Sequence, residues 1–343
     1  MKRNPRRPVW LCRLLMALSI CGVALVARAS DATYSIPLGS ALESYPYPYP
    51  VHFLPFDIEG EPTRMAYMDV QPESRGNGRS VVLLHGKNFY GSYWKETTDA
   101  LAAAGYRVIV PDQIGFGKST KPDIAYSFDL LAANTARLLE HLNIKQAALV
   151  GHSMGGMLAV RFARTYPRMT THLILENPIG LEDYRFKVPP QTTEEIYKRE
   201  LTESDPKKIR EFFQRYVVEW KPEVYQRFVE VRARLALGGE YTRWAKASAL
   251  TYQMIYQQPV RHEFRLIETP TLLVIGQEDR TTLGRGVVPP EVLNTLGQYP
   301  QLGRAAAKDI RDSSLIELTG VGHIPHLEAP QRFHNALLDF LKR

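Results

Sequence analysis

Ser153 lies in a short motif whose residue types and spacing suit a nucleophilic serine. The stretch LVGHSMGGMLAV (149–160) starts as an apolar run, places Ser153 between Gly151 and Gly155, and continues with a helical pattern. A G-x-S-x-G motif between a strand and a helix forms a tight turn, in which a side chain at either glycine would collide with the neighbouring backbone. The hydroxyl then stands at a helix N-terminus, where N–H groups stabilise negative charge. The motif predicts a nucleophile at Ser153, with a helix-capping serine as the structural alternative.

A serine hydroxyl needs a base that accepts its proton, and the base needs an acid that orients it. For a strand–turn–helix serine, the expected chain order is serine, acid, histidine. Asp279 ends the apolar run TLLVIGQED, and His323 follows the run SLIELTG. Both would then lie at the carboxyl ends of strands, where sites form in open α/β sheets. We therefore predict Asp279 as the acid and His323 as the base.

Other titratable residues near these positions are the alternatives. Glu278 is adjacent to Asp279 and should point the opposite way, whereas Glu176 ends another apolar run and is the alternative acid. His326 is expected to line a pocket or to pack, and His152 to support the serine turn from behind.

Acyl transfer also requires donors for the negatively charged oxygen of the tetrahedral intermediate. The backbone N–H of Met154, directly after the candidate nucleophile, is one expected donor. The second should come from the loop after VVLLHG, for which we predict the N–H of Lys87, with Asn88 as the alternative.

Short apolar runs alternate with amphipathic stretches along the chain. The strands and helices that these segments predict must position the candidate site residues. The runs at 81–85, 106–112, 147–153, 171–177, 271–279 and 314–320 predict strands, and the stretches at 93–104, 129–142, 154–166, 291–310 and 330–342 predict helices. Alternating strands and helices are typical of an α/β fold with a mostly parallel sheet flanked by helices. Residues 52–70 are expected to add one or two antiparallel edge strands.

One segment interrupts the alternation. Residues 181–261 have no strand pattern, and the stretches 194–204, 207–220 and 222–237 predict amphipathic helices. We interpret the segment as a helical insertion over the carboxyl edge of the sheet, within a core of residues 52–180 and 262–343. Its many aromatic residues favour a medium-sized, largely apolar, ester-like small molecule as the substrate.

The N-terminus has the pattern of a secretory signal peptide. MKRNPRRPVWLCR carries five cations, the next 13 residues are apolar or small, and Ala27-Arg28-Ala29 provides an A-x-A-like cleavage site. We therefore predict a signal peptide at residues 1–29, an irregular strap at 30–51, and export, most simply to a bacterial periplasm. An uncleaved anchor is the alternative, although 13 residues are fewer than the roughly 20 that span a bilayer.

Removal of residues 1–29 changes the charge and the cysteine content. The formal charge falls from +7 to +1, because the segment holds six Lys/Arg and no acid, and both cysteines leave with it. The excess of positive charge belongs mostly to residues 1–29 and therefore gives no indication of nucleic-acid binding. Membrane contact is expected only through the signal segment, and no pattern specifies an oligomeric state.

GFGKST lacks the first glycine of a phosphate loop, and no metal-ligand spacing occurs, so neither a cofactor nor a metal is expected.

The motifs HGKNF, DQIGFGKS, GHSMGG, IGQEDR and VGHIPHLEAP occur in the order found in the α/β-hydrolase superfamily, which the chain resembles from about residue 52 to its end. The resemblance implies that fold, with 181–261 as an inserted helical cap over a serine hydrolase site. Related branches cleave esters, lactones, amides or carbon–carbon bonds, and others are cofactor-free haloperoxidases. Branches with an aspartate nucleophile do not match Ser153, and HGKNF departs from the HGGPG of proline iminopeptidases.

Together these observations predict an exported serine hydrolase that cleaves a carboxylic ester through an acyl-enzyme. The alternatives are the same triad acting on a lactone, an amide or a carbon–carbon bond, and a binding protein that keeps the fold without turnover.

Overall fold

The structure is a computed structural model that describes residues 34–343. The expected signal peptide and the first residues of the strap lie outside this range. Residues 34–50 form neither helix nor strand. Among residues 34–343, no helix combines the length and the apolar character needed to cross a membrane.

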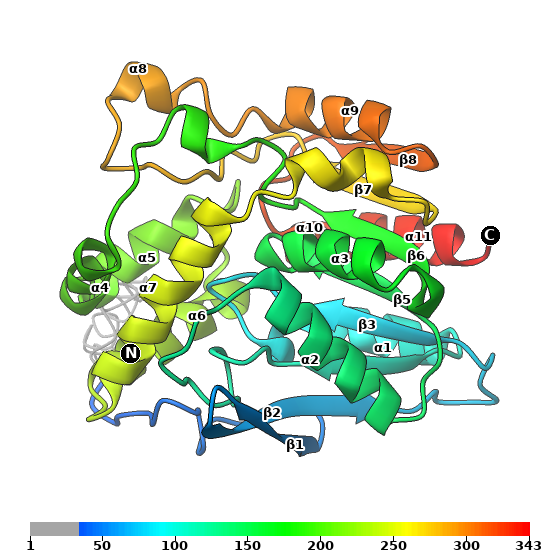
Figure 1. Ribbon diagram of the computed structural model, residues 1–343, viewed down its shortest axis with the longest axis horizontal. Helices are drawn as coiled ribbons and strands as arrows, with labels where there is room; N and C mark the ends of the chain where they lie inside the picture. Colours follow the sequence, from blue (N-terminus) through cyan, green and yellow to red (C-terminus); the bar gives the residue numbers. More distant parts are fainter. Residues whose placement is uncertain (1–33) are drawn as a thin grey trace, which may run out of the picture. The chain divides into compact units, whose positions relative to one another are not determined.

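The described chain contains a central sheet of eight strands in the order β1-β2-β4-β3-β5-β6-β7-β8 (Figure 1). β2 pairs in antiparallel fashion with β1 on one side and with β4 on the other, and all other neighbours are parallel. This arrangement confirms the mostly parallel α/β class. The strands are β1 (Val51–Ile58), β2 (Glu61–Val70), β3 (Ser80–Leu84), β4 (Arg107–Pro111), β5 (Ala147–His152), β6 (Thr170–Glu176), β7 (Thr271–Gly276) and β8 (Ser313–Leu318).

Helices cover both faces of the sheet and bury its apolar side chains. α2 (Phe128–His141) and α3 (Met154–Thr165) lie in front of it in Figure 1, and α9 (Tyr299–Asp309) belongs to the same hydrophobic core. α1 (Lys95–Ala103) and α11 (Pro330–Leu341) pack into a second core behind it, after the one-turn α10 (Pro325–Glu328). Both faces are covered because strands of a parallel sheet are apolar on both sides.

The segment between β6 and β7 is helical. It contains α4 (Thr193–Thr202), α5 (Pro206–Gln214), α6 (Pro222–Ala236) and α7 (Tyr241–Gln257), grouped to the left of the sheet in Figure 1. We call residues 181–261 the helical insertion. The sequence patterns indicated α4, α5 and α6 but not α7, because α7 buries mainly small or polar residues such as Ala245, Ala247 and Ser248.

The single helix expected at 291–310 is wrong. The structure has a one-turn α8 (Pro290–Leu293) and then α9, separated by a short loop. Gly297 in that loop has a φ of +63°, a conformation that ends a right-handed helix. Pro300 in the first turn of α9 starts the next helix, where proline is favoured.

Candidate active site

Ser153 occupies the sharp turn between β5 and α3. Its φ of 57° and ψ of −120° are strained for a residue with a side chain. A Cβ on Gly151 would overlap the main chain of Gly155, and a Cβ on Gly155 would overlap that of Leu84. Glycine is therefore required at both positions, as the motif indicated, and the turn presents the Ser153 hydroxyl at the N-terminus of α3.

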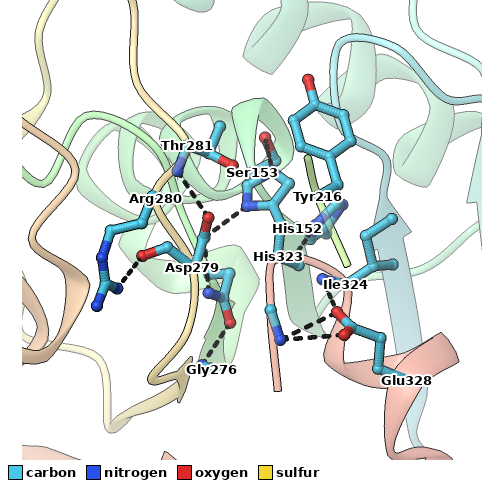
Figure 2. A network of polar contacts seen from close by, with 12 residues as sticks. His152, Ser153, Tyr216, Gly276, Asp279, Arg280, Thr281, His323, Ile324 and Glu328 are labelled. Atoms are coloured by element: carbon cyan, nitrogen blue, oxygen red, sulfur yellow. Dashed lines mark hydrogen bonds and ion pairs between the residues drawn. The ribbon is translucent and has the colours of Figure 1, made fainter. Parts of the chain in front are cut away.

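The structure brings Ser153, His323 and Asp279 together from three loops (Figure 2). Nε2 of His323 lies 3.0 Å from the Ser153 Oγ, and Nδ1 lies 2.7 Å from Oδ2 of Asp279. The carboxylate can only accept, so the hydrogen-bond partners assign the proton to Nδ1 and leave Nε2 as the acceptor for the serine hydroxyl. All three residues are buried, with Ser153 6% exposed.

Two further groups fix the Asp279 carboxylate. Nδ2 of Asn177 donates to Oδ2 of Asp279 at 2.8 Å, and the Thr281 N–H donates to Oδ1 at 2.7 Å. Oδ1 of Asn177 accepts from the N–H of Gly276 at 2.8 Å, which locks the amide orientation. Sequence reasoning missed Asn177. Its only signal in the sequence was a polar residue directly after the run that forms β6. In the structure, Asn177 has a positive φ of 35°.

The alternative acids do not contact His323. Glu176 receives a 2.6 Å hydrogen bond from the N–H of His326 and lies 2.9 Å from its Nδ1. This second pair is fully buried, and the His326 ring stacks on Trp94 at 4.1 Å between ring centroids. Glu278 is exposed. Of the alternatives considered, Asp279 alone lies within hydrogen-bond distance of His323.

His152 connects the serine turn to the loops on either side. Its Nδ1 lies 2.9 Å from the Tyr93 hydroxyl, which accepts the N–H of Gly86 at 3.1 Å. Its Nε2 lies 2.8 Å from the carbonyl oxygen of His323, so Nε2 carries the proton and Nδ1 accepts from Tyr93. Burial, followed by the neighbouring histidines, holds the pKa of His152 well below its usual value. The neutral ring therefore links the loop after β3 to the main chain of the candidate base.

Of the two expected oxyanion donors, Met154 directly follows Ser153, and Lys87 follows Gly86 in the loop after β3. Met154 is the first residue of α3, so its N–H has no acceptor within the helix. A Cβ on Gly86 would lie 3.1 Å from the Ser153 Cβ, so Gly86, the residue before Lys87, lies against the serine. The Lys87 ammonium extends into the helical insertion, 2.7 Å from the Ser248 hydroxyl and 3.8 Å from the Glu200 carboxylate.

The helical insertion contacts the candidate base directly. The Tyr216 ring lies over the His323 ring at 4.8 Å, and the Tyr216 carbonyl accepts the N–H of His323 at 2.6 Å. The Glu328 carboxylate accepts from Val218 N–H in the insertion at 3.0 Å. It also accepts from Ile324 N–H in the histidine loop at 3.2 Å (Figure 2). Sequence reasoning also missed these residues, since nothing local marks Tyr216 or Glu328 as neighbours of His323.

Within residues 34–343, no group of three or more His, Cys, Asp or Glu side chains could hold a metal ion. The arrangement at Ser153 instead has the parts that acyl transfer requires: a hydroxyl, a base oriented by a buried carboxylate, and main-chain donors at a helix N-terminus.

Comparison with known proteins agrees with this fold. A family model described as the alpha/beta hydrolase fold matches residues 79–330. The crystal structure of a probable hydrolytic enzyme from Pseudomonas aeruginosa is 47% identical, covers 89% of this chain and 98% of its own, and superposes with a TM-score of 0.87. The chain therefore belongs to the α/β-hydrolase family.

Curated relatives are more distant. A 2-hydroxy-6-oxononadienedioate/2-hydroxy-6-oxononatrienedioate hydrolase from Burkholderia vietnamiensis is 29% identical over 291 residues, which are 83% of this chain and 93% of that protein. A putative non-heme chloroperoxidase from Synechocystis is 27% identical over 296 residues, which are 81% and 96% of the two chains. These relatives support an enzyme of the α/β-hydrolase family.

Proposed function

We propose that the protein is a serine hydrolase that cleaves carboxylic esters through an acyl-enzyme on Ser153. The observation that carries this proposal is the continuous hydrogen-bonded series from the Ser153 hydroxyl through His323 to Asp279, at 3.0 and 2.7 Å. The strained backbone at Ser153 supports it, because such strain persists only where the surrounding structure enforces it and is concentrated at functional sites.

In the first half of the reaction, the Ser153 Oγ attacks the ester carbonyl carbon while His323 Nε2 accepts the hydroxyl proton. The carbonyl oxygen becomes negatively charged and is stabilised by the N–H groups of Met154 and Lys87. The carbon–oxygen bond to the alcohol then breaks, and His323 gives its proton to the leaving alkoxide. In the second half, water attacks the acyl-enzyme, His323 accepts a proton from it, and the acid leaves as Ser153 regains its proton.

Asp279 acts through His323. Its carboxylate holds Nδ1–H, so the ring presents Nε2 to the serine and the imidazolium is stabilised when it forms. Asn177 and the Thr281 N–H keep that carboxylate in place.

We propose that the helical insertion acts as a cap. Tyr216 lies over His323, and Ser153 is only 6% exposed, so a substrate must displace part of the insertion to reach the hydroxyl. Its aromatic side chains suit a largely apolar substrate.

The bond that is cleaved can be tested with matched substrates. Residues 30–343 and the Ser153→Ala variant would be assayed on short-chain p-nitrophenyl esters, on lactones and on aminoacyl anilides. The proposal predicts turnover of esters above the other two classes and its loss in the variant. A preference for lactones or anilides would overturn the ester assignment, and turnover that survives Ser153→Ala would overturn the nucleophile.

Export is proposed on the pattern of residues 1–29 alone. Expression of the full chain in a Gram-negative host, followed by fractionation and N-terminal sequencing, tests it. The expected result is a periplasmic protein that begins at or near Ser30, whereas an intact N-terminus in the membrane fraction would indicate the anchor.

A further inference from the structure

A small cavity lies between the loop after β3 and the helical insertion, next to the proposed oxyanion site. Its volume is about 50 Å³. A water needs about 10–15 Å³ by this kind of measure, so the cavity has room for a group of carboxylate size. The walls include residues 87–90, Lys121 from the loop after β4, Arg232 from α6 and Trp244 from α7.

Two aromatic rings, those of Phe89 and Tyr216, lie between the cavity and the candidate base. Phe89 lines the cavity, and its ring lies 6.0 Å from the Tyr216 ring, which in turn covers His323 at 4.8 Å. Asn88 also lines the cavity, and its side chain donates to the Tyr216 hydroxyl at 2.8 Å. The cavity is therefore bounded by residues 87–90, the same loop that carries the proposed oxyanion donor at Lys87.

The cavity lining carries three cations and no carboxylate. Lys87, Lys121 and Arg232 all line it, whereas no Asp or Glu does. Glu200 lies behind the lining, where it is 3.8 Å from the Lys87 Nζ and 2.9 Å from Arg232 Nη2. Glu203 lies 3.7 Å from the same guanidinium and is partly exposed. The surface that a ligand would contact is therefore positive, although carboxylates behind it offset part of that charge.

Two of these cations carry N–H donors for which residues 34–343 provide no acceptor. The Lys121 ammonium is buried and donates to the carbonyl oxygens of Gly117 at 2.5 Å and Ser119 at 2.9 Å, with no carboxylate at ion-pair distance within residues 34–343. This burial lowers the pKa of Lys121 to about 7. Arg232 is 7% exposed, and its Nε has no hydrogen-bond partner. A buried cation is stabilised by an anion that takes up its free donors.

We propose that this cavity binds a carboxylate of the substrate, so that the protein prefers esters carrying a carboxylate a few atoms from the scissile carbonyl. This inference rests on the proposed ester hydrolysis at Ser153. Lys87 connects the two functions, because its N–H is the proposed oxyanion donor while its ammonium lines the cavity. The aromatic wall takes the chain of the substrate, and the guanidinium and ammonium groups take its charged end.

The test compares matched esters in a pH-stat. On the acyl side, monomethyl adipate is paired with methyl hexanoate; on the alcohol side, the butyrate ester of 4-hydroxybutanoate is paired with butyl butyrate. The proposal predicts a kcat/KM about 10- to 100-fold higher for the carboxylate member of at least one pair, as expected for a charge-assisted hydrogen bond. Adipate should also inhibit the hydrolysis of a neutral ester more strongly than hexanoate does.

Three variants test whether the cations cause the preference. Arg232→Gln and Lys121→Met should each lower the ratio of carboxylate to neutral turnover by about 10-fold or more. Two variants are used because Arg232→Gln also removes a partner of Glu200 and can impair folding, which thermal unfolding would reveal. Arg243→Gln removes an exposed cation from α7 and should leave the ratio unchanged.

Equal turnover within both pairs, with neutral esters still cleaved, would overturn the carboxylate site and leave the ester hydrolase intact. If Arg232→Gln and Lys121→Met each lower kcat/KM equally for the carboxylate ester and the neutral ester of a pair, the cations only hold the insertion on the core, and the carboxylate site is overturned. No turnover of any ester would overturn the proposed function and the carboxylate site with it.

Discussion

The N–H of His323 donates to the carbonyl oxygen of Tyr216 at 2.6 Å, so the candidate base is hydrogen-bonded through its main chain to the helical insertion. The two segments are 107 positions apart in the sequence, from 216 to 323. A movement that opens the insertion must therefore break or stretch a contact of the base. Catalytic geometry and closure of the insertion are coupled in this arrangement.

Glu328 strengthens this coupling, since it accepts N–H groups from Val218, Gly322 and Ile324. Glu328→Ala leaves the partly buried N–H groups of Gly322 and Ile324 unpaired, which should lower the free energy of unfolding by about 1–3 kcal/mol and lower kcat. Glu328→Gln keeps one oxygen acceptor and should have a smaller effect. Urea unfolding and ester kinetics measure both, and an unchanged kcat in the alanine variant would contradict the coupling.

Asn177→Asp tests the support of Asp279. The new carboxylate can still accept from Gly276 but no longer donates to Asp279, and it brings a like charge against it. We expect kcat to fall about 10-fold or more with little change in KM. Asn143→Asp is a matched control, because Asn143 also has a positive φ but is exposed and follows α2. Equal kinetics for the two variants would contradict the role of Asn177.

Tyr93→Phe removes the hydroxyl that joins Gly86 to His152. The loss leaves a buried N–H and a buried ring nitrogen unpaired, so the free energy of unfolding should fall by about 1–3 kcal/mol. The loop that carries the oxyanion donor should also loosen, which lowers kcat. Tyr197→Phe, at a half-buried tyrosine of α4, controls for loss of a hydroxyl and should change neither quantity.

Buried histidines should make the fold less stable in mild acid. Burial lowers the pKa of His85, His152 and His334, the last to about 4. Since histidine in the unfolded chain has a pKa of about 6.5, the unfolded state binds more protons between these values, and the free energy of unfolding rises with pH there. Stability should therefore fall as the pH drops from 6.5 towards 4.

The matched variant for this effect is His334→Gln, whose amide still reaches the Thr97 hydroxyl but does not titrate. Urea unfolding at a series of pH values should give a smaller dependence on pH for the variant than for the wild type. Identical slopes for the two proteins would show that His334 keeps its ordinary pKa.

The sequence predicted those parts of the fold that local pattern determines. The six parallel strands are continuous apolar runs, and G-x-S-x-G marks the serine turn because steric overlap at Gly151 and Gly155 leaves no other residue. The chain order of serine, acid and histidine then indicated which strand ends should meet.

The missed features depend on contacts between distant segments or on weak local patterns. Asn177 reaches Asp279 across 102 positions, and Glu328 meets Val218 across 110. No spacing in the sequence marks such pairs before the sheet brings them together. α7 and the break before α9 were missed for local reasons, since small buried side chains weaken the helical period and Gly297 interrupts it.

The most direct test of the account is the reaction of residues 30–343 with a fluorophosphonate, followed by intact mass and peptide mapping. The account predicts one adduct on Ser153, none on Ser153→Ala, and slower labelling of His323→Asn, because the hydroxyl then lacks its base. Absence of an adduct on the folded wild-type protein, or an adduct on another serine, would contradict the assignment of Ser153 as the activated nucleophile.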